Sequence, residues 1–427
     1  MGNFKILFIT DRFLPTPTAN TINTQKIINE MRKRGHKITC IAVNQDETDS
    51  VVFHNTIPVY SIKSTWYGRL LQLSKENRLG LLGRITLKCL VFIRKIKNAL
   101  SIYKFPNVDP SQSKDVLKLV DKLYKQEGFD CVIGVFRPFS GVSAAISMKR
   151  KYPTLLCGAY YLDLISGSTK PSFVPNNLYK KLCYKGETKT FNELDFILMA
   201  KGGESTYSDS KYNRVNAKIN YIDFPLFNIE NGKHSIDYDK SKINLVYAGT
   251  LDKNYRNPIH MLRLVEKASK QINGIVLHLF GRGNCGSIIK EYKDRGSFQI
   301  IEHGMVPYEY VKSAMQQADF LINISNSTQN IVPSKIFELF STGKPILNFV
   351  SNKNDISKEY FNKYPAVCLI AEWEDVEKQM SFLKEFIIKE KGNCYPVEGL
   401  KEKYLQNTPE FTVNIIEEYL RINEEKD

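Results

Sequence analysis

The chain has 427 residues, which is too long for a single hydrophobic core, so we expect two domains. Its composition, 42% hydrophobic and 25% charged with a net charge of +15, is that of a globular protein and excludes a disordered or fibrous chain. The eight cysteines are scattered without a Cys-x-x-Cys pair, and no two histidines have metal-ligand spacing, which argues against a zinc site or a disulfide framework. The N-terminus does not resemble a signal peptide and no apolar run approaches roughly 18 residues, so we expect a cytoplasmic protein, soluble or peripheral to a membrane.

Apolar strands alternate with helices through the first part of the chain. "KILFIT" is almost continuously apolar, as expected of a strand whose two faces are both covered in a parallel sheet. The alternation continues to "YIDFPLF", so residues 1–227 are predicted to form a doubly wound α/β domain. The expected strands are 5–10, 37–43, 130–136, 154–163 and 195–200, with helices over 23–34, 115–129 and 140–152.

A basic segment interrupts this domain. Residues 60–104 contain ten Lys or Arg and one acid, Glu76, and aliphatic side chains are interleaved with the charges. Such a segment is typical of a membrane-surface element that is attracted to anionic lipid and inserts through Leu, Phe and Trp66. A solvated helix pair with one buried face is the alternative, and nucleic acid is a weaker interpretation because no nucleic-acid-binding motif accompanies the charge. The residues expected to meet the membrane are Arg84, Lys88, Arg94, Lys95 and Lys97.

A second α/β pattern follows a polar stretch. Residues 228–242 carry no apolar period, and we interpret them as a linker between domains. Residues 243–405 are predicted to form a second doubly wound domain, and residues 406–427 contain an amphipathic helix, "PEFTVNIIEEYL". Two such domains are expected to bind ligands in a cleft at the carboxyl ends of their strands. The strands expected in the second domain are 243–249, 274–281, 299–304, 319–325 and 345–350, with helices over 257–272 and 308–318.

Cations and glycines follow consecutive strands of the second domain. Lys253 and Arg256 follow its first strand, where basic side chains can neutralise a diphosphate. After the next strand, Arg282 lies between Gly281 and Gly283, and such glycines can let the backbone approach a ligand. Each feature alone has an ordinary structural explanation, but their coincidence on successive strand ends predicts an anion site.

The segment "NIVPSKIFELFSTGKPI" (330–346) predicts a short helix between two strands. Pro333 suits the first helical turn, and Gly343 suits the left-handed conformation that ends a helix. One face of this helix is apolar and is expected to be buried. That face consists of Ile336, Phe337, Leu339 and Phe340.

The other face of this helix is polar, with Ser334, Glu338 and Ser341 at helical spacing. The preceding loop, from Asn326 onward, is rich in hydrogen-bonding side chains, and the unpaired N–H groups of the first turn suit a phosphate. Glu338 lies too far along the helix for the phosphate but can accept hydrogen bonds from sugar hydroxyls. This is the arrangement of a bound nucleotide; an exposed Glu338 paired with Lys335 is the alternative.

Four segments of the second domain resemble a known family. "VYAGTLDKNYRNP", "LHLFGRG", "EHGMVPYEYVKSAMQQADFLINIS" and "VPSKIFELFSTGKPI" are similar to segments of the retaining GT-B glycosyltransferases of the family 4 type (glycosyl transferases group 1). The resemblance is strong over 243–349 and weak in the first domain, and its last motif is the most specific. It implies transfer of a sugar from a nucleotide-diphosphate donor, expected to be a UDP-sugar, without a metal or other cofactor. It also implies that the first domain holds the acceptor, the second domain holds the donor, and the final helix crosses back to the first.

The resemblance assigns roles to individual donor-side residues. Glu338 resembles the second glutamate of the family's E-x7-E motif, which binds the nucleotide ribose. The first glutamate falls on Asn330, an amide that can hold the donor sugar's hydroxyls without charge. Arg256, with Lys253 as a second candidate, resembles the basic residue that meets the diphosphate and stabilises the leaving group. The remaining residues of the expected donor site are Ser334, Lys335, Arg282, Gly281 and Asn326.

Three loops of the first domain are expected on the acceptor side. Asn20 and Thr21 stand where relatives often carry a Gly-Gly pair, and Asn20 can contact substrate or cap the following helix. Arg137 and Asp163 each follow a predicted strand. Relatives often carry a polar residue at the position of Asp163, so it joins the expected catalytic residues, with a helix cap as the alternative.

Together these patterns predict a glycosyltransferase at the inner face of the cell membrane. It would extend a lipid-linked glycan in capsule, exopolysaccharide or lipopolysaccharide biosynthesis, with no nucleic-acid partner. A nucleotide-sugar epimerase can share the two-domain fold, but it is expected to use several acids and a histidine around the sugar. A non-catalytic protein that binds sugar nucleotides or anionic polymers is a third interpretation, suggested by Asn330 and the basic charge. The histidines His36, His278 and His303 are expected to be structural.

Overall fold

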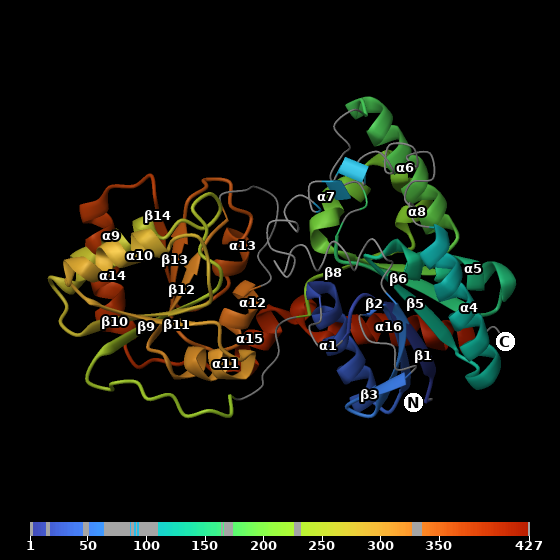
Figure 1. Cartoon of the computed structure of the whole chain (residues 1–427), viewed down its shortest axis with the longest axis horizontal. Helices are drawn as coiled ribbons and strands as arrows, with labels where there is room; N and C mark the ends of the chain where they lie inside the picture. The colour runs from blue at the N-terminus through green and yellow to red at the C-terminus, as the bar shows by residue number, and fades with distance from the viewer. Residues whose placement is uncertain are drawn as a thin grey trace. The chain divides into compact units, whose positions relative to one another are not determined.

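The computed structural model describes residues 3–13, 18–45, 51–63, 86, 89–90, 92–93, 110–163, 165, 174–225, 232–326 and 335–425. The chain divides into two compact units (Figure 1). The first unit combines Met1–Pro225 with Pro409–Asp427, and the second is Leu226–Thr408. In the part of the chain that the structure describes, no helix has the length and apolar character needed to cross a bilayer.

The first unit is built around an eight-stranded sheet. Its strand order is β3-β4-β2-β1-β5-β6-β7-β8, and every neighbouring pair is parallel except β3–β4. The order changes direction between β1 and β5, which is the switch point of a doubly wound sheet. The strands are β1 (Lys5–Thr10), β2 (Lys37–Gln45), β3 (Val51–His54), β4 (Ile57–Lys63), β5 (Cys131–Phe136), β6 (Leu156–Tyr161), β7 (Phe196–Ala200) and β8 (Ile219–Ile222). The helices are α1 (Ala19–Lys33), α4 (Pro110–Glu127), α5 (Phe139–Lys151), α6 (Asn176–Asn192), α7 (Glu204–Tyr207), α8 (Asn213–Asn216) and α16 (Pro409–Glu424).

Alternate residues of β1 supply the cores on the two faces of this sheet. Leu7 and Ile9 pack in a cluster with residues of α4, α5 and α6. Ile6 and Phe8 pack in a second cluster with residues of α1 and α16. All four side chains are buried, and burial of each contributes roughly 1.5–3 kcal/mol. Covering of both faces explains why the strand is apolar along almost its whole length.

The second unit holds a six-stranded, entirely parallel sheet in the order β11-β10-β9-β12-β13-β14. Its switch point lies between β9 and β12. One face is covered by α9, α10 and α14, which share a core, and the other by α11 and α12 (Figure 1). The strands are β9 (Ile243–Ala248), β10 (Ile275–Phe280), β11 (Gln299–Gly304), β12 (Phe320–Ile324), β13 (Ile346–Val350) and β14 (Val367–Ala371). The helices are α9 (Ile259–Ser269), α10 (Gly286–Arg295), α11 (Tyr308–Gln317), α12 (Lys335–Phe340), α13 (Lys358–Phe361), α14 (Val376–Glu390) and α15 (Val397–Lys403).

The predicted fold class is confirmed: the protein is α/β, with two doubly wound, Rossmann-like domains of the GT-B type. Strands β1 and β11 have the predicted bounds, and the other predicted strands differ by at most two residues at either end. Helix α1 begins at Ala19, four residues earlier than predicted, because Thr18 caps it with its side chain.

The stretch predicted to be a linker is in part fixed to the second unit. The backbone N–H groups of His234 and Ile236 donate to the side-chain oxygens of Ser313 (3.1 Å) and Gln317 (3.0 Å) on α11. The side chain of Ile236 is buried. Residues 232–242 are therefore polar because they hydrogen-bond to a helix, and the absence of an apolar period does not mark a free connection here.

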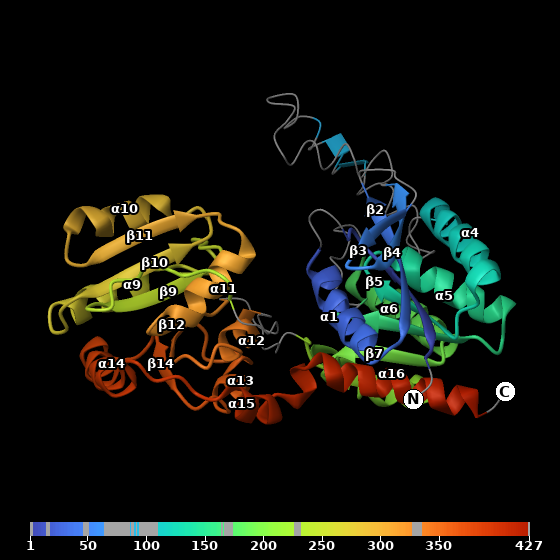
Figure 2. The same ribbon diagram turned by 90° about the horizontal axis from the view of Figure 1, so that it is seen from below.

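The last helix, α16, lies alongside α1 in the first unit (Figure 2). Its Glu417 is buried and accepts a hydrogen bond from Arg34 Nη1 (3.0 Å). The other carboxylate oxygen contacts His36 Nε2 at 3.0 Å. His36 thus has a structural role, since it joins the turn after α1 to α16.

A histidine pair, with His278 buried and His303 half-buried, joins β10 and β11. Asn244 donates from Nδ2 to the carbonyl of Asp239 (3.1 Å), so its Oδ1 accepts from His278 Nε2 (3.1 Å). His278 Nδ1 then carries no proton and accepts from His303 Nε2 (3.0 Å). Burial, with the charge of His303 as a smaller cause, lowers the pKa of His278 to about 4. His278 is therefore neutral at pH 7.

We expect the second unit to lose stability as the pH falls from about 6.5 towards 4, because the unfolded chain then binds a proton that folded His278 does not. A depressed histidine pKa stabilises the folded state above the unfolded pKa, and the full effect is about 3 kcal/mol. Urea unfolding of the wild type and His278→Gln across this pH range measures it. His54→Gln, on the edge strand of the first unit, is the control. Equal pH slopes for the wild type and His278→Gln would contradict the assignment.

Candidate functional site

The loops that follow β9 and β12 meet at the switch point of the second sheet. Loops that leave neighbouring strands in opposite directions form the usual ligand site of an open α/β sheet. The first loop spans residues 249–258, and the second begins with Ser325 and Asn326. Ser325 N–H donates to the carbonyl of Phe349 (2.9 Å), and Ser351 N–H donates to Ser325 Oγ (3.2 Å). The start of the second loop is therefore held against β13.

Two polar side chains hold the loop after β9 in one conformation. Asp252 Oδ1 accepts from the N–H groups of Asn254 (2.8 Å) and Tyr255 (3.2 Å), an arrangement typical of an Asx turn. Asn284, from the loop after β10, donates to Asp252 Oδ2 (2.8 Å) and accepts from the N–H of Lys253 (2.8 Å). The backbone of Lys253 is thus fixed, while its side chain is exposed.

The loop after β10 packs directly on the loop after β9. Gly281 has a φ of +123°, and a Cβ atom there would lie 2.2 Å from the carbonyl oxygen of Gly249. At Gly283 a Cβ atom would lie 1.8 Å from the carbonyl oxygen of Leu251. These glycines are required for contact between the two loops, whereas the sequence predicted that they make room for a ligand. Arg282 between them is exposed.

Arg256 bridges the two loops at the switch point. Its Nε donates to Asn326 Oδ1 (2.7 Å), and the side chain of Tyr247, at the end of β9, lies close enough to feel its charge. Burial raises the pKa of Tyr247 to about 12, although Arg256 opposes the shift, so the phenol is neutral and donates to the carbonyl of Thr250 (3.1 Å). Both of these neighbours of Arg256 are uncharged. Asn326 orients the guanidinium without neutralising it.

Helix α12 places two further charges near Arg256. Burial lowers the pKa of Lys335, Glu338 raises it, and Arg256 lowers it further. Because charges influence one another strongly only at short range, the two cations and the carboxylate share one small region. Among the described residues, neither Arg256 nor Lys335 has a carboxylate oxygen within 4.0 Å. Two neighbouring cations held without such a partner favour an anionic ligand.

Helix α12 is fixed by aromatic packing, and its predicted apolar face is buried. Phe340 stacks on Tyr364 and Tyr404, with ring centroids 4.9 and 4.8 Å apart. Gly343 has the predicted left-handed conformation, with a φ of +70°. A Cβ atom there would lie 2.2 Å from the carbonyl oxygen of Tyr395, so the segment after the helix packs tightly as well. Lys335 and Glu338 are therefore presented from a rigid support.

The structure brings four of the residues predicted for the donor site close together: Arg256, Asn326, Lys335 and Glu338. The predicted phosphate contact at the start of the helix falls on residues outside the described ranges. The predicted residues outside those ranges are Asn330 and Ser334, with the membrane residues Arg84, Lys88, Arg94, Lys95 and Lys97.

In the first unit, polar side chains gather where β1 and β5 end. Thr18 caps α1 by accepting from Thr21 N–H (3.3 Å), so Asn20 is not the cap. Asn20 lies in the first turn of α1 and donates from Nδ2 to the carbonyl of Phe136 (3.0 Å). The hydroxyl of the buried Thr21 lies 3.1 Å from that of Thr10 and 2.9 Å from that of Thr18. Thr21 therefore supports the loop from inside.

Arg137 and Asp163 lie together at the ends of β5 and β6. Arg137 Nε is 3.7 Å from Asp163 Oδ2, and both side chains are about half exposed. An ion pair this exposed contributes little to the stability of the fold, so a stabilising role does not explain why the two residues are there. The N-cap of α6 is Pro175 and makes no side-chain hydrogen bond, so Asp163 does not cap that helix.

Sequence reasoning missed three residues that shape the donor-side loops: Tyr247, Asp252 and Asn284. Asp252 could have been identified because it stands two residues before Asn254 in a strand-end loop, a pattern typical of an Asx turn. Tyr247 is the one aromatic residue of β9, and its hydroxyl suggests a polar partner near the strand end. Asn284 has no comparable signal, because its role depends on a loop that is distant in sequence.

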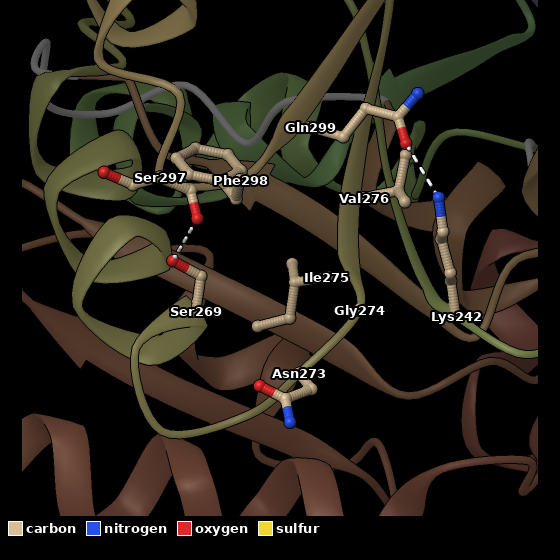
Figure 3. Close-up of a pocket in the computed structure, with 9 residues that line it drawn as sticks. All are labelled: Lys242, Ser269, Asn273, Gly274, Ile275, Val276, Ser297, Phe298 and Gln299. Atoms are coloured by element: carbon tan, nitrogen blue, oxygen red, sulfur yellow. Dashed lines mark hydrogen bonds between the residues drawn. The ribbon is translucent and has the colours of Figure 1, made fainter.

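A hollow lies at the opposite edge of this sheet (Figure 3). It opens at the amino ends of β10 and β11, where Lys242 Nζ donates to Gln299 Oε1 (3.1 Å) and Ser269 Oγ donates to the carbonyl of Ser297 (3.1 Å). None of the predicted site residues lines it.

Comparisons with known proteins find similarity to glycosyltransferases. Residues 256–386 match a family model described as glycosyl transferase-like. No curated protein matches the chain. Among solved structures, the chain is similar to the lipopolysaccharide outer core galactosyltransferase WaaB, at 14% identity over 96% of this chain and 97% of that one (TM-score 0.49). It is also similar to WaaG, a glycosyltransferase involved in lipopolysaccharide biosynthesis (11% identity, 96% and 99% coverage, TM-score 0.48).

The matched residues begin at Arg256 and include Asn326, Lys335 and Glu338, the four residues that meet at the switch point. The family model thus supports a glycosyltransferase of the group 1 type, in agreement with the motifs of the second domain.

Proposed function

We propose that the protein transfers a sugar from a nucleotide-diphosphate donor to a glycan acceptor, with retention of configuration and without a metal. A UDP-sugar is the expected donor. The observation that carries the proposal is the orientation of Arg256 by Asn326 (Nε to Oδ1, 2.7 Å) at the switch point of the second sheet, near the helix that bears Lys335 and Glu338. Among the described residues, no group of three His, Cys, Asp or Glu side chains is placed to hold a metal ion.

The two cations and the carboxylate suit different parts of such a donor. Transfer breaks the bond between the anomeric carbon and a phosphate oxygen, and negative charge grows on the departing diphosphate. Arg256, oriented by Asn326, would stabilise that charge together with Lys335. Glu338 would accept hydrogen bonds from the ribose hydroxyls. Groups that are already in position when the charge develops are effective because they need no rearrangement, and Asn326 gives Arg256 that property.

A thermal-shift screen against UDP-, GDP-, dTDP- and ADP-sugars tests the donor proposal. At a hundredfold excess over Kd, the correct donor should stabilise the protein by about 2.7 kcal/mol. Glu338→Ala should weaken binding by roughly ten- to a hundredfold, because hydrogen bonds to a charged group contribute about 1.5–3 kcal/mol. Glu385→Ala, an exposed change on α14, is the control and should keep the full shift. If no nucleotide sugar stabilises the wild type, the proposal fails.

The proposed acceptor is a lipid-linked glycan in surface polysaccharide biosynthesis, with the protein peripheral to the inner face of the membrane. The support is the basic, aliphatic-rich composition of residues 60–104. Basic residues near an anionic surface contribute about 1 kcal/mol each, so neutralising five of them should abolish binding to phosphatidylglycerol vesicles. Binding that is unchanged would contradict the proposal. The variant changes Arg84, Lys88, Arg94, Lys95 and Lys97 to Gln, and a control of equal charge changes Lys378, Lys384, Lys389, Lys391 and Lys401.

A further inference from the structure

A chain of hydrogen bonds runs across the carboxyl edge of the first sheet and ends on a carboxylate. Ser140 Oγ donates to Gln112 Oε1 (3.2 Å), and Gln112 Nε2 donates to Asn44 Oδ1 (2.7 Å). Asn44 Nδ2 donates to Asp11 Oδ1 (2.7 Å). The four residues come from α5, α4, β2 and the loop after β1, and the last of these lies at the switch point. We call these four residues the Asp11 relay.

The Asp11 relay has only one arrangement of donors and acceptors. Each amide accepts with its oxygen and donates with its nitrogen, and a carboxylate can only accept. Ser140 and Gln112 are buried, with 4% and 9% of their surface exposed, while Asp11 at the outer end is half-buried. Buried polar chains of this kind polarise one another and hold the terminal group in one orientation. The inner three residues therefore orient the carboxylate of Asp11.

The backbone of β2 is adapted to this arrangement. Asn44 has a left-handed conformation, with a φ of +64°, and the pairing of β2 with β4 shifts register between Ala42 and Gln45. A left-handed residue other than glycine costs about 1 kcal/mol or more, although Asn tolerates it better than most. The irregularity turns Asn44 out of the regular alternation of the strand, with its amide directed to Asp11.

The charge of Asp11 selects the kind of ligand. Burial raises the pKa of Asp11, while Asn44 and Arg12 oppose the shift. A carboxylate has about four acceptor positions, and the relay occupies one of them. Arg12, whose Nε donates to the carbonyl of Asn44 (3.4 Å), is a cation beside Asp11, and a hydroxyl can donate to the free positions of the carboxylate. A molecule rich in hydroxyl groups therefore fits here.

We propose that Asp11 binds a hydroxyl of the acceptor sugar, and that Asn44, Gln112 and Ser140 are its positioning residues. This rests on the proposed transferase function and adds to it a specific acceptor contact in the first unit. The assignment differs from those made for Arg137 and Asp163, which form a half-exposed ion pair at the ends of β5 and β6.

The test separates donor binding from acceptor binding. The probes are octyl β-glucoside, octyl β-galactoside and octyl α-mannoside as acceptors, with the nucleotide sugar selected by the thermal-shift screen. Asp11→Asn keeps the shape of the side chain, and should raise the KM for the acceptor at least tenfold while donor KM and donor hydrolysis stay at wild-type values. Ser140→Ala should raise the same KM two- to fivefold. Asp115→Asn, an exposed change on α4, is the control and should have no effect.

A second variant covers the case in which Asp11→Asn does not fold. Asn44→Gly preserves the left-handed backbone and removes the amide next to Asp11, so it should raise the acceptor KM without changing the donor KM. If Asp11→Asn has the wild-type acceptor KM, the inference is overturned and the proposed function stays intact. If only Asn44→Gly folds, a wild-type acceptor KM in that variant has the same meaning. Donor hydrolysis without transfer to any of the three glycosides also overturns it. Failure of every nucleotide sugar to bind instead overturns the proposed function.

Discussion

Replacing Arg256 with alanine is expected to lower the transfer rate by about 10²- to 10³-fold, the usual effect of removing one preorganised donor to a developing charge. The guanidinium is held by Asn326, so its orientation is set before the donor binds. Lys335 is too close to Arg256 for its charge to be independent, and its pKa should rise when Arg256 is removed. The measurement is release of nucleotide diphosphate from the donor that stabilises the wild type, at saturating donor.

Companion variants separate the charge of Arg256 from its geometry. Arg256→Lys keeps the charge but loses the planar fork, and we expect it to recover only part of the rate. Asn326→Ala keeps the guanidinium but removes the acceptor of its Nε hydrogen bond, so a smaller loss is expected. Arg263→Ala, on the exposed side of α9, should retain the wild-type rate. A rate for Arg256→Ala within threefold of the Arg263→Ala rate would mean that Arg256 is not the residue that stabilises the leaving group.

The architecture could be predicted because the two sheets impose a strong sequence pattern. Strands covered on both faces, such as β1 and β9, are almost uniformly apolar, and the turns that separate them from helices are marked by glycine or polar residues. Switch points then follow from the order of the elements, since the loops that leave the first strand of each domain must lie there. Lys253 and Arg256 could be placed at the second switch point without any knowledge of side-chain contacts.

Other elements lack such a pattern. The edge hairpin β3–β4 was missed because β3 is short and its residues are partly exposed, and because its turn uses Asn55 and Thr56, both at positive φ, where Asn-Gly is the recognisable pair. Strand β14 lies at an edge of the second sheet and exposes Leu369, so its side chains are not all buried as they are in a central strand. Edge strands are solvated on one side, which weakens the signal that identifies central strands.

Contacts within the sites were harder to predict than the residues that bear charge. The sequence identifies Arg256 and Glu338 by residue type and position, but it contains no sign that Asn326 orients Arg256. The Asp11 relay joins residues up to 129 positions apart. Ser140 follows a predicted strand and could be placed at its end, but Gln112 carries no signal of its own because amides are common in helix ends. Long-range hydrogen-bond partners follow from the packing of the elements, which no local pattern records.

Glu417→Ala is expected to destabilise the first unit by about 3–5 kcal/mol, the usual effect of removing one partner from a buried ion pair. Glu417 is 2% exposed and joins α16 to Arg34 and His36, with both contacts at 3.0 Å. Truncation leaves a guanidinium and a buried imidazole facing an empty space between α1 and α16. Urea unfolding followed by far-ultraviolet circular dichroism should show an earlier transition for one of the two units, with the other unaffected.

The pH dependence of stability and a control variant at Glu418 test whether the effect of Glu417→Ala comes from the ion pair. Burial raises the pKa of Glu417, but His36 and Arg34 outweigh it and lower the pKa below the ordinary value of 4.5. A depressed carboxyl pKa stabilises the folded state above pH 4.5, and this contribution is lost as the pH falls through the folded pKa. The difference between the wild type and Glu417→Ala should therefore shrink in acid. Glu418→Ala, one residue further on the exposed face, should change stability by less than about 0.5 kcal/mol, and an equal effect of the two variants would show that α16 is held by its apolar face alone.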